Sequence, residues 1–384
     1  MTRLLDNCPD RRDGESVKWN VYAKDVLPMW VADMDVRSPQ AVIDALQRRV
    51  STGVFGYPLP SRELIDVIVK RLLDRYQWQI AREDVILVPG VVSGFNLAAQ
   101  AFTNPGNSLI IQTPVYPPFL CAAENAGARG IQNDLVQQPD GRYIIDFDSF
   151  ERTIEPDTTA FIMSNPHNPV GRVFTKEELE KLGEICLRHG VTIISDEIHS
   201  DLIYPVYLHI PIASISPELA KNTITFIAPS KTFNVAGLDC AVMICSDQAK
   251  RERLEKARKG LLGHVNLMGQ AAALAAYTGG QEWLDQLLVE LEENRNLLFD
   301  FVNQRLQGIS MAKPEGTYLA WLDCRKLSLP TDPYYFFLEQ ARVAMNDGRE
   351  FGAAGEGFLR LNFGCSQRML VEALTRMETA LNNR

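Results

Sequence analysis

Short apolar runs rich in β-branched residues alternate with amphipathic segments through the middle of this 384-residue chain. The clearest unit begins with an apolar run at 159–163 and ends with a second one at 191–194. Between them, Thr175 and Glu178 have the spacing of a helix capping box, and Gly190 is a typical helix end. Strand, helix and strand in this order predict an α/β fold with a mostly parallel central sheet flanked by helices.

The rest of the chain extends this pattern to a large domain and a smaller one. The predicted strands are 85–88, 108–112, 223–228 and 241–245, and the predicted helices are 41–50, 61–77 and 281–307. The last part mixes strands at 318–322 and 358–362 with helices at 333–343 and 366–382, which is an α+β pattern. Because the chain is longer than one ordinary core requires, we expect three parts. These are an N-terminal segment (1–45) that packs with the small domain, a large domain (46–280) and a small C-terminal α+β domain (281–384).

Composition and charge exclude several classes of function. The net charge is −9, with acidic and basic residues interspersed, so we expect neither a nucleic acid nor an anionic membrane surface as partner. The polar N-terminus lacks a signal core, and no apolar run approaches a membrane span. Seven cysteines without C-x-x-C spacing predict reduced thiols in a cytoplasmic protein. Five histidines in no metal-binding pattern predict no metal site.

Lys231 follows the apolar run 223–228 almost at once. A buried strand that delivers an amine to its end is unusual, because desolvation of an ammonium is costly. Burial lowers the pKa of such an amine, and a neutral amine can form a Schiff base with an aldehyde. A solvated lysine is the alternative if this residue is considered alone.

Two other strands are followed by polar groups of complementary chemistry. The strand at 85–88 leads into Gly90, Val91 and Val92 at a predicted helix start, where free backbone N–H groups suit a phosphate. A plain strand-to-helix turn is the alternative. Asn168 lies in a loop stiffened by two Asn-Pro pairs, which can hold one amide side chain in a fixed direction, or simply form a turn.

Asp196 follows the apolar strand 191–194 directly, and His199 lies three residues further on. A carboxylate at this position needs a cation, either in a structural ion pair or on a ligand. His199 is expected to bind the same ligand or to cap a turn. Open parallel sheets bind ligands at the carboxyl ends of their strands. A phosphate cradle, an amide, a carboxylate and a lysine at that edge would together hold pyridoxal 5′-phosphate (PLP).

These residues belong to a series of motifs that keep one order along nearly the whole chain. The motif segments are 28–35, 53–57, 113–116, 164–171, 195–199, 230–234, 317–323 and 357–362. In this series the chain resembles the fold-type I PLP-dependent enzymes of aminotransferase class I/II. More narrowly, it resembles the cystathionine β-lyases of the MalY/PatB type. One departure is Val36, where that group usually has phenylalanine, and it concerns substrate preference rather than the cofactor.

The resemblance implies a role for each candidate residue. Lys231 would form the Schiff base with PLP and act in catalysis together with Tyr116, which would stack on the ring. Asp196 would pair with the pyridine nitrogen and Asn168 with the ring oxygen. His199 occupies a position that is tyrosine in many aminotransferases, and it also belongs to the cofactor site.

The remaining assignments concern the phosphate, the substrate and a second subunit. The phosphate would bind to Gly90, Val91, Val92 and Ser230. Tyr57 would reach the phosphate from a second subunit, which implies a homodimer with its active site at the interface. Arg360 would bind the substrate α-carboxylate bidentately. The segments that close over the site would include Asp33, Asp35, Tyr318 and Trp321. Ordinary packing is the alternative for these residues.

The implied activity is β-elimination on a small sulfur amino acid. L-Cystathionine, L-cysteine or a related S-conjugate would give pyruvate, ammonia and a thiol. The closest alternative is a PLP-dependent aminotransferase that uses a 2-oxo acid, because both activities require the same cofactor-binding residues. The combination of His199 with the segments 29–35 and 53–57 favours the lyase. A non-catalytic regulator or binding protein of this fold is the remaining alternative, but no basic helix-turn-helix segment precedes Trp30.

Overall fold

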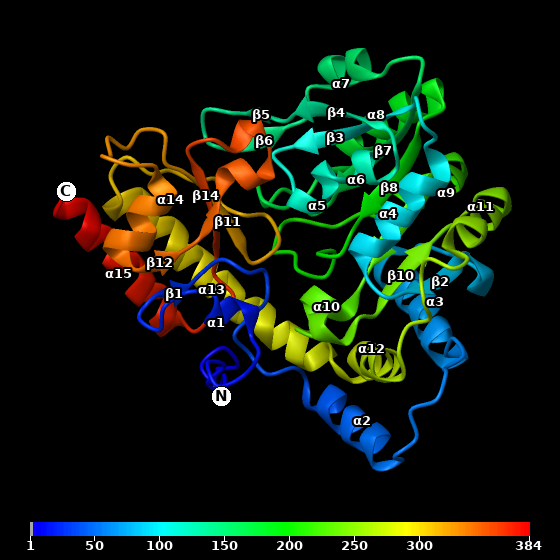
Figure 1. The fold of residues 1–384 in the computed structure, drawn as a ribbon, viewed down its shortest axis with the longest axis horizontal. Helices are drawn as coiled ribbons and strands as arrows, with labels where there is room; N and C mark the ends of the chain where they lie inside the picture. Colours follow the sequence, from blue (N-terminus) through cyan, green and yellow to red (C-terminus); the bar gives the residue numbers. More distant parts are fainter. Residues whose placement is uncertain (1–2) are drawn as a thin grey trace.

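A computed structural model describes residues 3–384, and a seven-stranded sheet forms its centre (Figure 1). The strand order is β2-β10-β9-β8-β7-β3-β4. The strands are β2 (Val85–Val88), β3 (Ser108–Thr113), β4 (Arg129–Asp134), β7 (Thr158–Ser164), β8 (Thr192–Asp196), β9 (Thr223–Ile227) and β10 (Ala241–Ile244). All neighbours pair in parallel except β10, which is antiparallel to β2 and β9. The predicted mostly parallel sheet is therefore confirmed.

Helices cover both faces of this sheet because its strands are apolar on both sides. Along β7, Ile162 belongs to the core cluster under helix α4 (Val91–Phe102), whereas Phe161 belongs to the cluster on the opposite face. That second cluster includes helix α8 (Lys176–His189). Alternation of side chains along each strand thus builds two cores from one run of residues. The predicted capping box of Thr175 and Glu178 is present at the start of α8.

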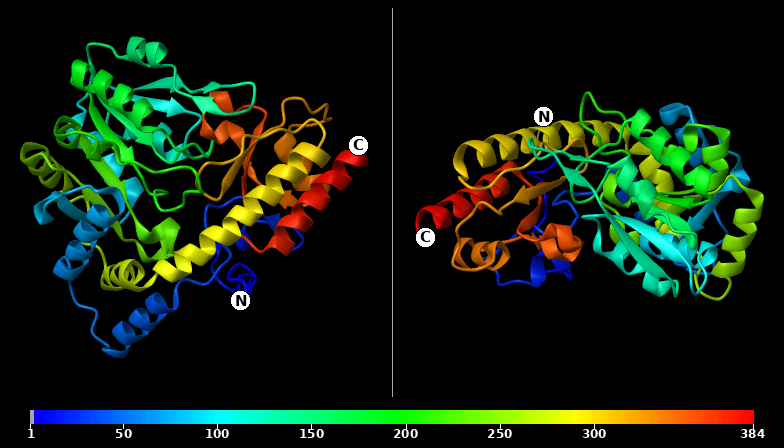
Figure 2. Two further views of the ribbon diagram at one scale, coloured as in Figure 1. Left: turned by 180° about the vertical axis from the view of Figure 1, so that it is seen from behind. Right: turned by 90° about the horizontal axis from the view of Figure 1, so that it is seen from above.

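A second, smaller sheet lies in the C-terminal part of the chain. Its strands are antiparallel and have the order β11-β14-β13. Helices α13 (Gln281–Arg305, yellow) and α15 (Gln367–Asn382, red) lie side by side next to this sheet in Figure 2. The strands are β11 (Leu319–Asp323), β13 (Asn346–Asp347) and β14 (Phe358–Asn362). Strand β1 (Leu27–Pro28) pairs in parallel with β12 (Val343–Ala344), so the N-terminal segment lies against this part. Strands β5 (Val136–Gln137) and β6 (Tyr143–Ile144) form a separate pair.

The helix predicted at 333–343 is present over residues 333–341, but it is not one regular α-helix. Helix α14 covers only Pro333–Phe336, a π-helical turn follows at Phe337–Ala341, and Arg342 has a left-handed backbone with φ of 55°. The chain then enters β12, because Val343 pairs with Leu27. Pairing with a distant strand therefore ends the helix early. The other helices are α1 (Val17–Asn20), α2 (Gln40–Ser51), α3 (Arg62–Tyr76), α5 (Pro117–Leu120), α6 (Ala122–Asn125), α7 (Phe147–Thr153), α9 (Pro217–Asn222), α10 (Pro229–Thr232), α11 (Gln248–Arg258) and α12 (Leu267–Gly279).

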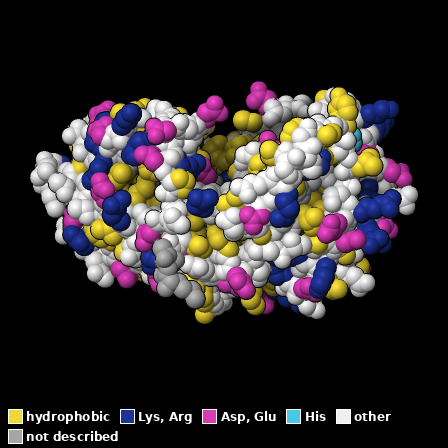
Figure 3. Space-filling model, turned by 90° about the horizontal axis from the view of Figure 1, so that it is seen from below, with side chains coloured by type: hydrophobic (Ala, Val, Ile, Leu, Met, Phe, Trp, Pro, Cys, Tyr) yellow, Lys and Arg dark blue, Asp and Glu magenta, His cyan; other side chains and the backbone are white. Residues whose placement is uncertain are grey.

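Surface charge is mixed on the face drawn in Figure 3, where basic and acidic side chains are interspersed. Within residues 3–384, every helix is too short or too polar to cross a membrane.

Helix α4 lies close to the sheet at Gly94, and a substitution at this residue tests that packing. A Cβ at this position would lie 2.5 Å from Cε1 of Phe226 on β9, so the buried ring would have to move. We expect Gly94→Ala to lower the free energy of unfolding by about 1–3 kcal/mol. Gly263→Ala, where a Cβ meets open space, is the control and should change it by less than ~0.5 kcal/mol. Equal denaturant midpoints for the two variants would contradict this packing.

Candidate active site

A cavity of about 760 Å³ lies where β2, β7, β8 and β9 end, and it is bordered by β13 and β14. All residues predicted to act in catalysis, cofactor binding or substrate binding line it, except Tyr57. Those residues are Gly90, Val91, Val92, Tyr116, Asn168, Asp196, His199, Ser230, Lys231 and Arg360. Residues as far apart in the sequence as Gly90 and Arg360 thus meet at one sheet edge, as expected for open parallel sheets.

One end of the cavity is the N-terminus of α4. Gly90 is the N-cap residue, and the first helical hydrogen bond runs from the N–H of Gly94 to the carbonyl of Gly90. The N–H groups of Val91, Val92 and Ser93 therefore have no acceptor within the helix. Ser230 lies on α10 and lines the same cavity. Free N–H groups at the positive end of a helix dipole fit a phosphate.

Asp196 is the last residue of β8, and its carboxylate is buried. It accepts one hydrogen bond, from the backbone N–H of Ile198 at 3.0 Å. Burial raises the pKa of Asp196 to about 7. Within the described residues 3–384 no cation forms an ion pair with this carboxylate, which argues against a structural ion pair. A protonated pyridine nitrogen supplies the cation that such a carboxylate requires.

Lys231 enters the cavity from α10, and its ammonium group donates a hydrogen bond to the carbonyl of Ala32 at 2.8 Å. Burial and the nearby Arg360 charge lower the pKa of Lys231 to about 8. A substantial fraction of this amine is therefore neutral near physiological pH, as Schiff-base formation requires.

Arg360 on β14 is a buried guanidinium held by neutral groups. It donates to Asn168 Oδ1 at 3.0 Å, to the Trp30 carbonyl at 3.0 Å and to Asn346 Oδ1 at 2.6 Å. Its Nε is buried without a partner, and burial lowers the pKa of Arg360 to about 10. A buried cation that lacks a carboxylate partner is suited to bind the carboxylate of a ligand. Asn346 was not predicted, since one asparagine in a short strand gives no sequence signal.

His199 and Tyr116 complete the wall of the cavity. Burial and the charges of Lys231 and Arg360 lower the pKa of His199 to about 3, so the ring is neutral. Its Nδ1 is buried without a hydrogen-bond partner. Tyr116 is the N-cap residue of α5, and burial raises the pKa of its hydroxyl. His199 and Tyr116, together with the helix terminus, Asp196 and Lys231, fit PLP.

Several residues of the predicted site lie elsewhere. Tyr57 is fully exposed on the segment between α2 and α3. Asp33 and Asp35 bind Arg11 instead of lining the cavity. Trp321 stacks on Phe358 in the core, with ring centroids 5.1 Å apart, and so has the ordinary packing role.

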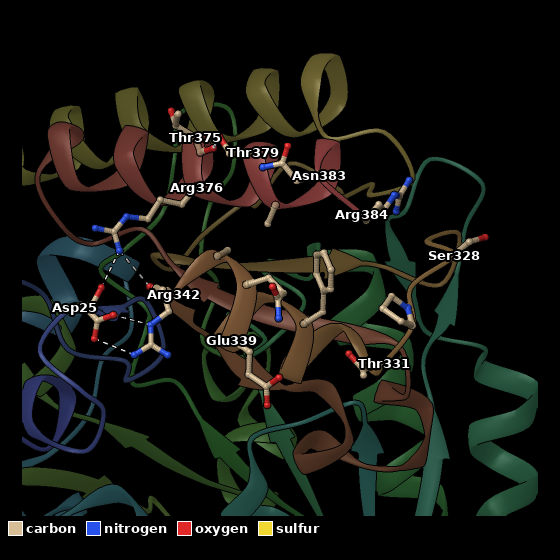
Figure 4. Close-up of a pocket in the computed structure, with 15 residues that line it drawn as sticks. Asp25, Ser328, Thr331, Glu339, Arg342, Thr375, Arg376, Thr379, Asn383 and Arg384 are labelled. Carbon is tan, nitrogen blue, oxygen red and sulfur yellow. Dashed lines mark hydrogen bonds and ion pairs between the residues drawn. The ribbon is translucent and has the colours of Figure 1, made fainter.

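A larger cavity, of about 1060 Å³, lies beside α15 and the segment 328–342 (Figure 4). Three of its charged groups already have partners. Arg342 forms an ion pair with Asp25 at 2.7 Å, and Arg376 donates to the carbonyl of Asp25 at 2.8 Å. Among the described residues that line this cavity there is no lysine and no buried carboxylate, so chemistry rather than volume identifies the active site.

Known proteins of one family are similar to this chain along nearly its whole length. Residues 24–377 match the family described as aminotransferase class I and II. The chain is 40% identical to cystathionine β-lyase PatB of Bacillus subtilis, over 98% of this chain and 100% of that protein. The crystal structure of cystalysin from Treponema denticola, which contains PLP, is 35% identical with a TM-score of 0.95 and covers 100% of both chains. A PLP-bound C–S lyase from Staphylococcus hominis is 30% identical with a TM-score of 0.92, over 99% of this chain and 98% of that one.

The family match covers most of the chain, and these relatives align from end to end. The resemblance inferred from the ordered motifs is therefore confirmed. The chain belongs to the aminotransferase class I and II family, within its group of PLP-dependent carbon–sulfur lyases.

Proposed function

We propose that this protein is a PLP-dependent carbon–sulfur β-lyase that cleaves L-cystathionine or a related sulfur amino acid to pyruvate, ammonia and a thiol. The observation that carries the proposal is one cavity that combines Lys231, Asp196 and a carboxylate-free Arg360. The names of the full-length relatives, cystathionine β-lyase and C–S lyase, support the reaction class.

The cofactor would be held by groups from several elements. The helix α4 terminus and Ser230 bind the phosphate, Asp196 binds the ring nitrogen, and Tyr116 covers the ring. The Oδ1 of Asn168 accepts a hydrogen bond from Arg360, so its Nδ2 would be the group that donates to the cofactor oxygen. Neutral His199 adds a polar group without adding charge. When bound, PLP withdraws electrons from the substrate Cα, which makes its proton removable.

The chain's own residues then bind the substrate and move the proton. Arg360 fixes the α-carboxylate, and the neutral partners of its guanidinium keep its charge uncompensated for that purpose. The Nζ of Lys231 accepts the Cα proton, for which its lowered pKa is suitable. The bond between Cβ and sulfur then breaks, and the sulfur departs as a thiolate that takes up a proton to become the thiol. The remaining three-carbon fragment reacts with water to give pyruvate and ammonia.

Transamination is the alternative, because the same residues hold the cofactor in both reactions. The similarity of the whole chain to carbon–sulfur lyases, at up to 40% identity, favours elimination.

A homodimer is the second part of the proposal. The segment between α2 and α3 exposes Val54, Phe55, Tyr57 and Leu59, and its residues 53–60 have no regular secondary structure. An exposed apolar segment of this kind is suited to contact another protein surface. We assign that surface to a second copy of the chain, whose cavity would receive Tyr57.

The location and the domain division complete the proposal. All seven cysteines are free thiols, which supports a cytoplasmic protein. Pairing of β1 with β12 supports an N-terminal segment (1–45) packed with a small domain (281–384), beside a large domain (46–280) that binds the cofactor.

Pyruvate release tests the reaction directly. We expect pyruvate and a free thiol from L-cystathionine in equal amounts, with the same rate whether or not 2-oxoglutarate is present. Lys231→Ala should lower kcat roughly 10²–10⁴-fold, because it removes the proton acceptor. Product that forms only with the oxo acid, and without thiol, would establish the aminotransferase instead.

The pH dependence of cofactor uptake tests the charges around Lys231. Uptake by the cofactor-free protein requires the neutral amine, so its rate should rise with pH with a midpoint near 8. Arg360 disfavours the ammonium form of Lys231, so Arg360→Leu should raise the pKa of Lys231 and move the midpoint to higher pH. Stopped-flow absorbance between about pH 6 and 10 measures this. Arg342→Leu, in an exposed ion pair, is the control, and an unchanged midpoint in Arg360→Leu would refute the assignment.

Mixing two inactive variants tests whether Tyr57 acts across subunits. In a hybrid dimer of Tyr57→Ala and Lys231→Ala protomers, one site would have both native residues and the other neither. Random exchange should therefore restore about a quarter of the wild-type activity. If Tyr57 acted within its own subunit, mixing would restore nothing beyond the activity of the separate variants.

A further inference from the structure

The irregular segment Trp30–Met34 forms one wall of the active site, and its carbonyl oxygens bind catalytic side chains. The Trp30 carbonyl accepts a hydrogen bond from Arg360 at 3.0 Å. The Ala32 carbonyl accepts two, from Lys231 Nζ and from the Tyr318 hydroxyl, each at 2.8 Å. The two cations that bind substrate and cofactor are thus both oriented by backbone oxygens of this segment.

The other carbonyls of the segment are also occupied. Asn362 on β14 donates to the carbonyls of Val31 and Asp33. Asn234 donates to the Met34 carbonyl at 2.9 Å and accepts from the Met34 N–H at 3.1 Å. Five consecutive carbonyls therefore have side-chain donors, which replaces the hydrogen bonds that a helix or strand would supply. Because these bonds are directional, a small displacement of the segment would misplace several of them at once.

A buried ionic cluster holds the segment from the side away from the cavity. Lys18 on α1 is only 1% exposed, and its ammonium lies 2.7 Å from Asp35 Oδ2 and 3.1 Å from the Asp33 carbonyl. Arg11 binds Asp35 at 2.8 Å and Asp33 at 2.7 Å. Trp19 Nε1 donates to Asp35 at 2.8 Å. Two cations and two carboxylates balance, so the cluster is neutral as a whole.

This ionic cluster contacts both ends of the segment Trp30–Met34. Asp33 and Asp35 flank Met34 at the end of the wall, and the Lys18 carbonyl accepts a hydrogen bond from Trp30 Nε1 at 3.1 Å at its beginning. Lys18 therefore contacts both ends of the five-residue segment. Loss of one member of a buried ion pair leaves an uncompensated charge and displaces its neighbours.

We propose that Lys18 and Asp35 are positioning residues of the active site. Their ion pair fixes the segment Trp30–Met34, and the segment in turn orients Arg360 through the Trp30 carbonyl and Lys231 through the Ala32 carbonyl. Neither residue touches the cavity, so each acts only through this wall. The kinetic part of this inference rests on the proposed function, whereas the spectroscopic part requires only that PLP binds at Lys231.

The test compares Lys18→Met with Lys24→Met, a matched control at an exposed lysine of the same N-terminal segment. Both holoenzymes are assayed at a temperature at which circular dichroism shows full folding. We expect Lys18→Met to raise KM about tenfold or more, through the displaced Arg360, and to lower kcat through the displaced Lys231. The pH at which the visible absorbance of bound PLP titrates should also shift, because it reports on the surroundings of Lys231. Lys24→Met should change none of these.

A folded Lys18→Met enzyme with wild-type KM and wild-type absorbance titration would overturn the proposal. If Lys18→Met does not fold, the double variant Lys18→Met/Asp35→Asn removes both charges and avoids an unpaired carboxylate. A stable double variant that still has a raised KM and a shifted absorbance titration supports a positioning role. A stable double variant with wild-type KM and wild-type titration shows a purely structural role and overturns the proposal. If the wild type has no lyase activity, the proposed function fails, but the absorbance titration still decides this inference.

Discussion

The structure depends on the burial of two cations, Lys231 and Arg360, in a cavity where neutral groups bind them. Burial of an unpaired charge is costly, and most proteins avoid that cost with a carboxylate at ion-pair distance. Here backbone carbonyls and asparagine amides hold both cations in place. The opposite situation holds for Asp196, whose buried carboxylate forms no ion pair within the described residues 3–384. Each of these charges is therefore available to a ligand, which explains why the cavity suits a molecule with a cationic ring, an aldehyde and a bound carboxylate.

The two parts of the chain contribute differently to this arrangement. Strand β8 of the parallel sheet supplies Asp196, the loop after β7 supplies Asn168, and the element after β9 supplies Lys231, all at one edge. The smaller antiparallel sheet supplies Arg360, and the N-terminal segment supplies the carbonyl wall. Since Arg360 binds Asn168 on one side and Trp30 on the other, it joins all three parts of the fold at the point where a substrate carboxylate would bind.

Much of the fold could be predicted from the sequence, because its signals are local. The strand at 85–88, the capping box at Thr175 and the helix end at Gly190 depend on neighbouring residues, and the structure has them as expected. The helix predicted at 333–343 ends at residue 341, because Val343 pairs with Leu27, which lies far away in the sequence. The same limit applies to the site. Residues with unusual local contexts, such as Lys231, were found, whereas Asn346 and Lys18 act through long-range contacts that no local pattern reveals.

The central claim is that this cavity binds PLP through Lys231. Borohydride reduction of the yellow holoenzyme, followed by proteolysis and mass spectrometry of the peptides, tests it most directly. If PLP is bound at Lys231, the peptide containing Lys231 should carry the mass of the reduced cofactor, and peptides with other lysines should not. Cofactor mass on a different lysine, or no retained cofactor in a folded protein supplied with PLP, would show that PLP is not bound at Lys231.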